Sequence, residues 1–109
     1  MNFYIGDSIN AINPNDKNVG ISDELLEFLY DNRHVFSNGY FFLQEIDPFD
    51  DVVIGKTQIA LLLEMCNTII RSKLLNDYAD EEEANSITEL KDLVQEAIKQ
   101  NKSMVSIGE

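Results

Sequence analysis

The sequence predicts an α+β fold in which three helices pack on a small, mostly antiparallel sheet. Three segments have apolar residues at helical spacing, and several short segments are rich in β-branched or aromatic residues. Clusters of Asn, Asp, Gly and Pro separate these segments. A chain of 109 residues with 44% hydrophobic residues fits one domain with its own core. We therefore expect residues 1–109 to form a single acidic domain.

The N-terminal third of the chain predicts a strand, a loop and a helix. Residues 2–5 carry aromatic and β-branched side chains that favour a strand. Residues 6–20 are rich in Asn, Asp and Gly, which predicts an irregular loop. Ser22 is a good N-cap, and the two acids that follow it suit the positive end of a helix. The helix is expected to end near residues 32–33.

The middle of the chain predicts two strands and the strongest helix. The aromatic run at residues 40–46 reads as a strand, and residues 52–54 read as another that Gly55 ends. Apolar residues then recur every three or four positions over residues 56–75. They are Ile59, Leu63, Cys66, Ile70 and Leu74, with Leu62 and Ile69 beside them. This breadth of apolar surface predicts that the second helix is the most buried element.

The C-terminal part predicts an acidic loop, a helix and a strand. Residues 76–85 carry five acids and read as a solvated loop. Ser86 and Glu89 have the spacing of a capping box, so a helix is expected from there to about Gln100. Residues 104–107 read as a final strand, which we expect to pair with the strand at residues 2–5.

Charge is the unusual feature of the composition. The chain has 8 Lys and Arg against 20 Asp and Glu, which gives a net charge of -12. Such a charge repels nucleic acid and anionic membranes, so we expect neither as a partner. It attracts basic proteins and speeds their association. Solubility alone is the competing explanation, because acidic composition needs no specific partner.

The cysteine content and the first residues predict a cytoplasmic protein. Cys66 is the only cysteine, so no disulfide can form within one chain. Residues 1–7 have no basic stretch followed by an apolar run, as a secretory signal would have. The longest apolar run, at residues 59–63, is far shorter than a membrane span.

Residues suited to catalysis are few. The single histidine, His34, has no nearby catalytic partner in the sequence, and Cys66 lies on the apolar side of a predicted helix. We therefore expect no enzyme. An enzyme remains the alternative if a deep pocket gathers His34 or Cys66 with several acids.

Metal and phosphate sites are not expected either. Asp47, Asp50 and Asp51 are close in sequence, as are the acids at residues 80–83, but neither group has the spacing of a calcium loop. The tripeptide at residues 55–57 matches the end of a phosphate-binding loop, whose first glycine would fall at Asp50. We expect no cofactor.

Residues 46–58 form a local pattern around a predicted strand-to-helix corner. An apolar segment ends in Asp-Pro-Phe, an apolar pair follows, and Gln58 lies early in the next helix. The pattern resembles one in small bacterial proteins of uncharacterised function, with Asp50 in place of their Gly and Val52 in place of their Thr. A structural role explains it as well, since Asp side chains bond nearby backbone in turns and Gln58 could bond to this Asp loop.

The short chain, its high negative charge and its lack of catalytic residues resemble the small acidic immunity proteins that neutralise toxins passed between bacteria. This resemblance implies a protein partner, a basic toxin such as a nuclease, whose active site the chain would cover. A secretion chaperone for an effector protein and a regulatory binding module are the alternatives, and the oligomeric state is left open. The expected contact residues are Glu24, Glu27, Tyr30, Asp31, Asp77, Tyr78, Asp80, Glu81, Glu82 and Glu83.

Overall fold

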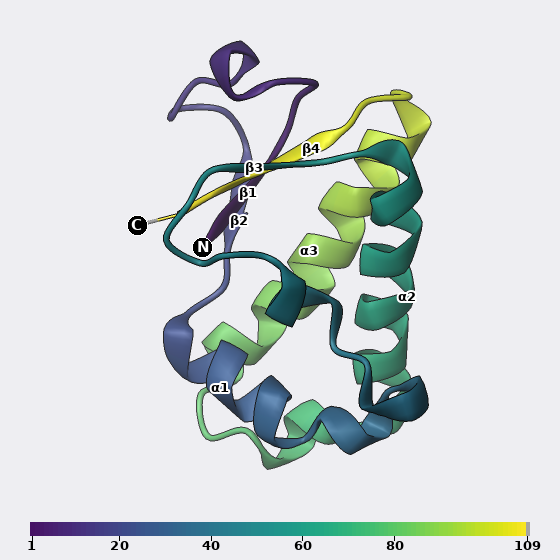
Figure 1. Cartoon of the computed structure of the whole chain (residues 1–109). Coiled ribbons are helices and arrows are strands. Elements are labelled where there is room, and N and C mark those ends of the chain that lie inside the picture. The colour runs from purple at the N-terminus through teal and green to yellow at the C-terminus, as the bar shows by residue number, and fades with distance from the viewer. Residues whose placement is uncertain (109) are drawn as a thin grey trace.

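Four antiparallel strands form one sheet in the order β2-β1-β4-β3, and the helices pack on one of its faces (Figure 1). The computed structural model describes residues 1–108. The strands are β1 (Asn2–Ile5), β2 (Asn18–Gly20), β3 (Val52–Ile54) and β4 (Met104–Ile107). The α-helices are α1 (Asp23–Asp31), α2 (Lys56–Ser72) and α3 (Glu81–Lys99). Short 3-10 helices are η1 (Ile9–Ala11), η2 (Arg33–Val35), η3 (Ser37–Gly39), η4 (Phe42–Glu45) and η5 (Leu74–Asp77).

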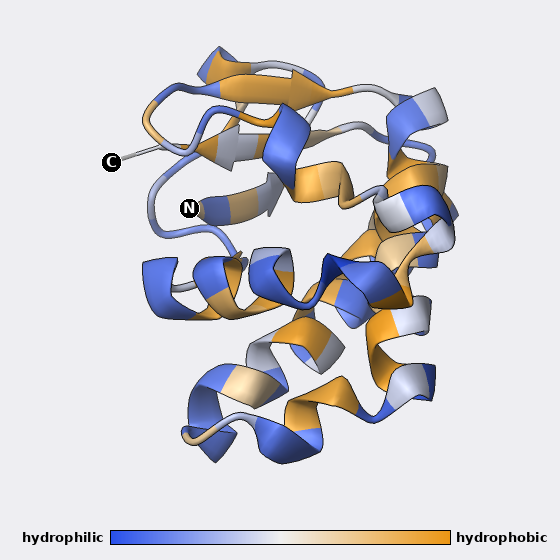
Figure 2. Cartoon of the chain, turned by 60° about the horizontal axis from the view of Figure 1, so that its bottom comes forward, coloured by the Kyte–Doolittle hydropathy of each residue, from blue (hydrophilic) through white to orange (hydrophobic). Residues whose placement is uncertain are grey.

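The α+β class and the antiparallel sheet agree with the prediction. The expected three helices leave out the 3-10 helices, which the sequence pattern did not indicate. Hydrophobic residues gather where the helices face the sheet and each other (Figure 2). Among residues 1–108, every helix is too short or too polar to cross a lipid bilayer.

The two terminal strands pair with each other, as predicted, and they lie at the centre of the sheet. β4 lies between β1 and β3, with Phe3 opposite Ser106 and Val52 opposite the same serine. β2 was not expected, because residues 6–20 read as a loop. Its single buried side chain, Val19, lies opposite Phe3, and pairing with β1 holds the strand in place.

The prediction that α2 is the most buried element is wrong. Seven of the 19 residues of α3 are buried, against five of the 17 in α2. α3 contacts β1 and β2 on one side and α2 on the other, whereas α2 lies further from the sheet (Figure 1). α3 is therefore more buried than α2, because α3 lies between the sheet and α2.

The apolar side of α2 is rotated relative to the expected one, and the helix ends earlier. Its buried residues are Ile59, Leu62, Met65, Cys66 and Ile69, while Ile70 is 38% exposed. The helix stops at Ser72, whose Oγ donates to the carbonyl of Ile69 at 2.8 Å. Lys73 follows with a left-handed backbone, at φ 59°, and the chain continues as η5.

Residues 40–46 do not form the predicted strand. Phe41, Phe42 and Leu43 are all buried, although they are consecutive. A strand would place alternate side chains on opposite faces, whereas an irregular entry into a 3-10 helix directs neighbouring side chains into the same core. The core therefore decides the conformation of this segment.

α3 begins five residues before the expected capping box. Asp80 is the N-cap, and its Oδ1 accepts a hydrogen bond from the backbone N–H of Glu83 at 3.0 Å. Ser86 lies inside the helix, is 8% exposed, and donates its hydroxyl to the carbonyl of Glu83 at 2.5 Å. The predicted loop at residues 76–85 is therefore η5, a short connection and the first turn of α3.

Most of the other local predictions are confirmed, but the expected bond between Gln58 and the Asp loop is wrong. Ser22 caps α1, with its Oγ accepting from the backbone N–H of Leu25 at 3.1 Å, and the helix ends at Asn32. Two Asp side chains of residues 47–51 bond nearby backbone: Asp47 Oδ1 accepts from the N–H of Phe49 at 2.8 Å, and Asp50 Oδ1 accepts from that of Asp51 at 2.9 Å. Asp51 Oδ1 instead accepts from the N–H of Gly108 at 3.1 Å. Gln58 bonds the N–H of Gly55 at 3.1 Å and so closes the first turn of α2, not the Asp loop.

Candidate protein-binding site

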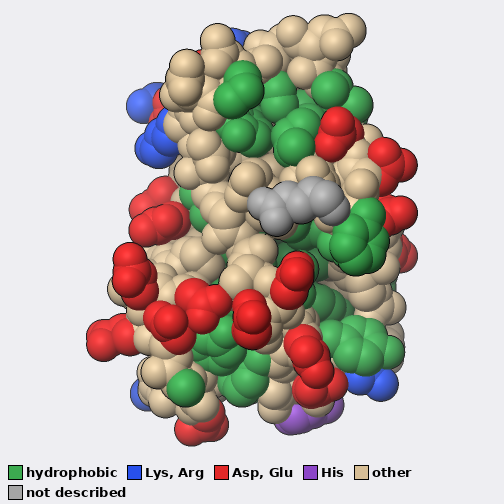
Figure 3. Space-filling view, turned by 90° about the vertical axis from the view of Figure 1, so that its left-hand side faces the viewer, with side chains coloured by type: hydrophobic (Ala, Val, Ile, Leu, Met, Phe, Trp, Pro, Cys, Tyr) green, Lys and Arg blue, Asp and Glu red, His purple; other side chains and the backbone are tan. Residues whose placement is uncertain are grey.

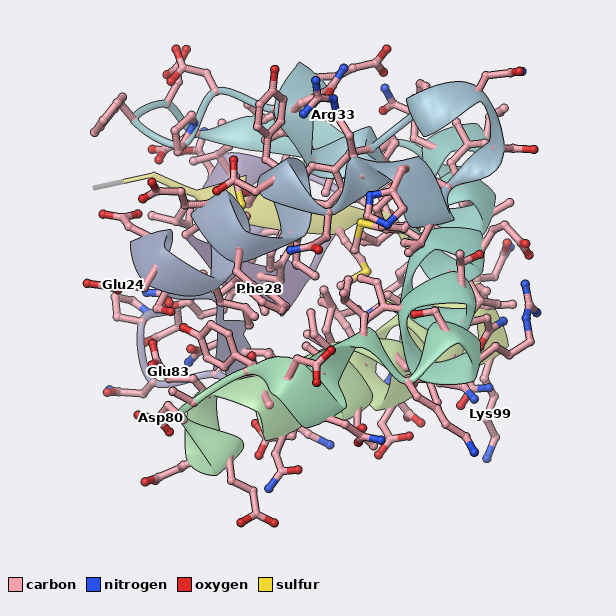
Figure 4. The ribbon with its side chains drawn as sticks, turned by 90° about the horizontal axis from the view of Figure 1, so that it is seen from below. Glu24, Phe28, Arg33, Asp80, Glu83 and Lys99 are labelled. Atoms are coloured by element: carbon pink, nitrogen blue, oxygen red, sulfur yellow. The ribbon has the colours of Figure 1, made fainter. Side chains whose placement is uncertain are left out.

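The starts of α1 and α3 lie beside each other, although 50 or more residues separate them in the sequence. The ring of Phe28 on α1 packs edge-on against the ring of Tyr78, which precedes α3, with 5.0 Å between the ring centroids. Seen in space-filling form, Asp and Glu side chains gather over the lower half of this side of the molecule (Figure 3). Glu24, Asp80 and Glu83 all lie at this end (Figure 4).

Tyr78 is the centre of this arrangement. Its hydroxyl donates to Oε2 of Glu83 at 3.3 Å. Burial raises the pKa of Tyr78 above 10.0, and the charge and hydrogen bond of Glu83 and the charge of Glu24 raise it further, while the nearby Ser22 hydroxyl lowers it. The hydroxyl is thus within reach of the first residues of both helices. We name Glu24, Tyr78, Asp80 and Glu83 the acidic surface.

The remaining predicted contact residues surround the acidic surface or extend from it. Glu27 and Asp31 are exposed and follow Glu24 at spacings of three and seven, so they continue along the same side of α1. Glu81 and Glu82 are exposed in the first turn of α3, and Asp77 is exposed at the end of η5. No hydrogen bond or ion pair in residues 1–108 joins these five acids to the other helix.

Tyr30 is exposed, but a residue of its own helix end covers part of its ring. The guanidinium carbon of Arg33 lies 4.2 Å from the ring centroid of Tyr30. The same guanidinium donates to the carbonyl of Tyr30 at 3.0 Å. A partner that contacts this ring would therefore meet a positive charge first. The sequence interpretation missed Arg33, although the spacing of three on a helix is typical of such cation–π pairs.

A hollow adjoins the acidic surface between η5 and α3. It encloses about 600 Å³. Tyr78 and Glu81 line it on the acidic side, Asn85 and Thr88 add an amide and a hydroxyl, and Lys73 lies at the rim. The surface is therefore concave beside its acids.

Cys66 and His34 do not share a site. Cys66 is fully buried, and this burial raises the pKa of its thiol from 9.0 to about 12, although the charge of Lys91 lowers it. His34 lies in an open hollow of about 510 Å³ together with Asp31 and Arg33. Within residues 1–108, no three side chains among His, Cys, Asp and Glu come close enough to hold a metal ion.

Comparisons with protein-family models, with curated proteins and with solved structures find no match to this chain. The assignment of a site therefore depends on the geometry of the acidic surface. The sequence indicated all four of its members, but it missed the contact between Phe28 and Tyr78 that brings the two helices together. No spacing in the sequence relates Phe28 to residue 78, because 50 residues separate them.

Proposed function

We propose that this chain is an immunity protein that binds a basic bacterial toxin, such as a nuclease, and neutralises it by covering its active site. The observation that supports the proposal is the acidic surface. Glu24 and Glu83, from two helices, lie within electrostatic reach of one aromatic hydroxyl in a chain of net charge -12. A nuclease needs a positive active site to bind its substrate, and such a site complements this surface.

The acidic surface suits fast and specific binding. The negative field of the whole chain steers a basic partner toward it, and this effect weakens as salt is added. The packed rings of Phe28 and Tyr78 hold the starts of α1 and α3 in place before binding. Surface that is already ordered loses less conformational entropy on association. The carboxylates of the acidic surface then meet Lys and Arg side chains of the toxin.

The proposal can be tested by capture followed by inhibition. The tagged chain is used to recover partners from the cells that produce it, at physiological salt, and recovered proteins are identified by mass spectrometry. The recovered protein is then purified, and its nuclease activity on DNA and RNA is measured with and without the chain. We expect a basic protein whose activity falls in proportion to the amount of chain added.

Charge-reversal variants identify the surface that binds. Glu24→Lys with Glu83→Lys should weaken inhibition by at least tenfold, since each close charge pair is worth about 1.5 kcal/mol or more at such interfaces. Glu89→Lys with Asp92→Lys changes the net charge equally on an exposed part of α3 and is the matched control. If both pairs of substitutions weaken inhibition equally, the interaction depends on the net charge of the chain and not on the acidic surface. Recovery of a secreted effector without inhibition would contradict the proposal and favour a chaperone.

A further inference from the structure

A second hollow lies away from the acidic surface, between α2 and the segment at residues 36–42. Its floor is made by the buried side chains of Phe36, Phe42 and Met65. Its walls are Tyr40 and Leu61, which are 38% and 46% exposed. The hollow encloses about 260 Å³. We name it the aromatic groove. None of its lining residues belongs to the acidic surface.

Two carboxylates and one exposed arginine lie at the aromatic groove. Glu64 is the only charged side chain among the described residues that line it. Glu45 lies beside it and accepts a hydrogen bond from the hydroxyl of Tyr40 at 2.8 Å. Arg71 donates to Glu64 at 3.3 Å and to Thr68 at 3.3 Å, but the side chains of Arg71 and Glu64 are both about two-thirds exposed. An ion pair this exposed contributes little and yields readily to a competing cation.

These two properties define one kind of occupant. A volume of about 260 Å³ is below the ~300–1,000 Å³ of pockets that hold drug-sized ligands, and it fits one large side chain. The apolar floor favours an aromatic or large aliphatic group. The acids at the rim favour a positive charge next to that group. A second copy of the chain is disfavoured, since both copies carry a charge of -12.

We propose that the aromatic groove is a docking site for a basic segment of a partner protein, which inserts one large apolar side chain beside a Lys or Arg. The side chain covers Phe36, Phe42 and Met65, and its positive neighbour lies against Glu64 and Glu45. This contact is separate from the acidic surface and does not depend on the partner being a toxin. It adds a second, apolar contact away from the acidic surface.

The test uses three small probes that share one indole ring and differ in charge. Tryptophan amide carries a positive amine, N-acetyltryptophan amide is neutral, and N-acetyltryptophan carries a carboxylate. Each is titrated into the isotope-labelled protein at low ionic strength, and amide shifts are followed by NMR. We expect shifts centred on Ser37, Tyr40, Leu61 and Thr68. The positive probe should bind about two- to fivefold more tightly than the neutral one, and the negative probe most weakly.

Variants separate the apolar and the charged parts of the site. Leu61→Ala should weaken all three probes, while Ile98→Ala, which removes an equally exposed side chain from α3, should leave them unchanged. Glu64→Gln should reduce the preference for the positive probe and leave binding of the neutral probe unchanged. Leu61 and Glu64 are both exposed, so neither change threatens the fold.

Three outcomes would overturn the proposal. Shifts spread over the whole surface would mean that the groove has no specific affinity for an indole. Equal affinity for the three probes would show that the groove does not prefer a positive charge, which contradicts the proposed Lys or Arg beside the inserted side chain. A dimer in sedimentation that Leu61→Ala dissolves would assign the groove to a second copy. Loss of inhibition in the acidic-surface variants with unchanged probe binding would leave the groove proposal intact.

Discussion

Phe28 and Tyr78 pack ring against ring at 5.0 Å, with an angle of 63° between their planes, and join α1 to the segment before α3. Edge-to-face geometry of this kind adds stability beyond the buried area of the rings. The contact decides how the acidic surface is assembled, because Glu24 follows the orientation of α1 and Glu83 that of α3.

Removing both rings should lower the free energy of unfolding by less than the sum of the two single substitutions. In a double-mutant cycle of Phe28→Ala and Tyr78→Ala, we expect a coupling energy of about 0.5–1.5 kcal/mol. The free energy of unfolding is measured by urea denaturation. Tyr78→Phe is the control, since it keeps the ring and loses only the hydroxyl bonded to Glu83. Strictly additive losses would mean that the two rings do not interact.

Asp80 has two roles that substitutions can separate. Asp80→Ala removes the N-cap of α3 and should lower the free energy of unfolding by about 1 kcal/mol. Asp80→Asn keeps a capping side chain, so it should stay within a few tenths of a kcal/mol of wild type while losing one charge of the acidic surface. Urea denaturation measures both, and Glu82→Gln controls for the loss of charge in the same turn. If Asp80→Ala and Asp80→Asn lower the free energy of unfolding equally, Asp80 does not act as the N-cap.

Ser106 is expected to lower the stability of the native protein. Its side chain is fully buried, and its Oγ has no hydrogen-bond partner among the described residues. Ser106→Ala should therefore raise the free energy of unfolding by about 1 kcal/mol, because an unpaired buried polar group costs about 1–3 kcal/mol. Ser86→Ala is the matched control, since that buried serine is bonded to Glu83. A stabilised Ser86→Ala with an unchanged Ser106→Ala would contradict this assignment.

Cys66 should make stability depend on pH in the alkaline range. Burial raises the pKa of its thiol from 9.0 to about 12. Above pH 9 the unfolded chain can ionise this thiol while the folded chain keeps it protonated, so stability is present below pH 9 and falls as pH rises toward 12. The slope is about 1.4 kcal/mol per pH unit. In thermal or urea unfolding, the difference in stability between wild type and Cys66→Ala should stay constant up to pH 9 and change only above it. Parallel curves would show that the thiol is not protected.

Elements with local signals were predicted well. Ser22 begins α1 and Gly55 precedes α2, because caps act on the backbone within three residues. The start of α3 was misplaced because two capping patterns compete there. Asp80 with Glu83 has the same spacing as Ser86 with Glu89, and three glutamates in the first turn favour the earlier start.

Elements that depend on distant contacts were missed. β2 has one apolar residue, Val19, and exists because its backbone pairs with β1. Residues 40–46 have the composition of a strand, but three consecutive buried side chains require another geometry. The acidic surface also depends on a distant contact that local sequence does not indicate. Its acids could be named from the sequence, whereas the contact that joins α1 to α3 belongs to tertiary structure.

The position of β4 has a consequence for synthesis of the chain. β4 is the strand made last, yet it lies between β1 and β3 and pairs with both. While residues 104–107 are still inside the ribosome, β1 can pair only with β2, and β3 has no strand to pair with. Such unpaired edges attract other chains. The sheet therefore closes only after residues 104–107 have left the ribosome, when β4 pairs with both of its neighbours.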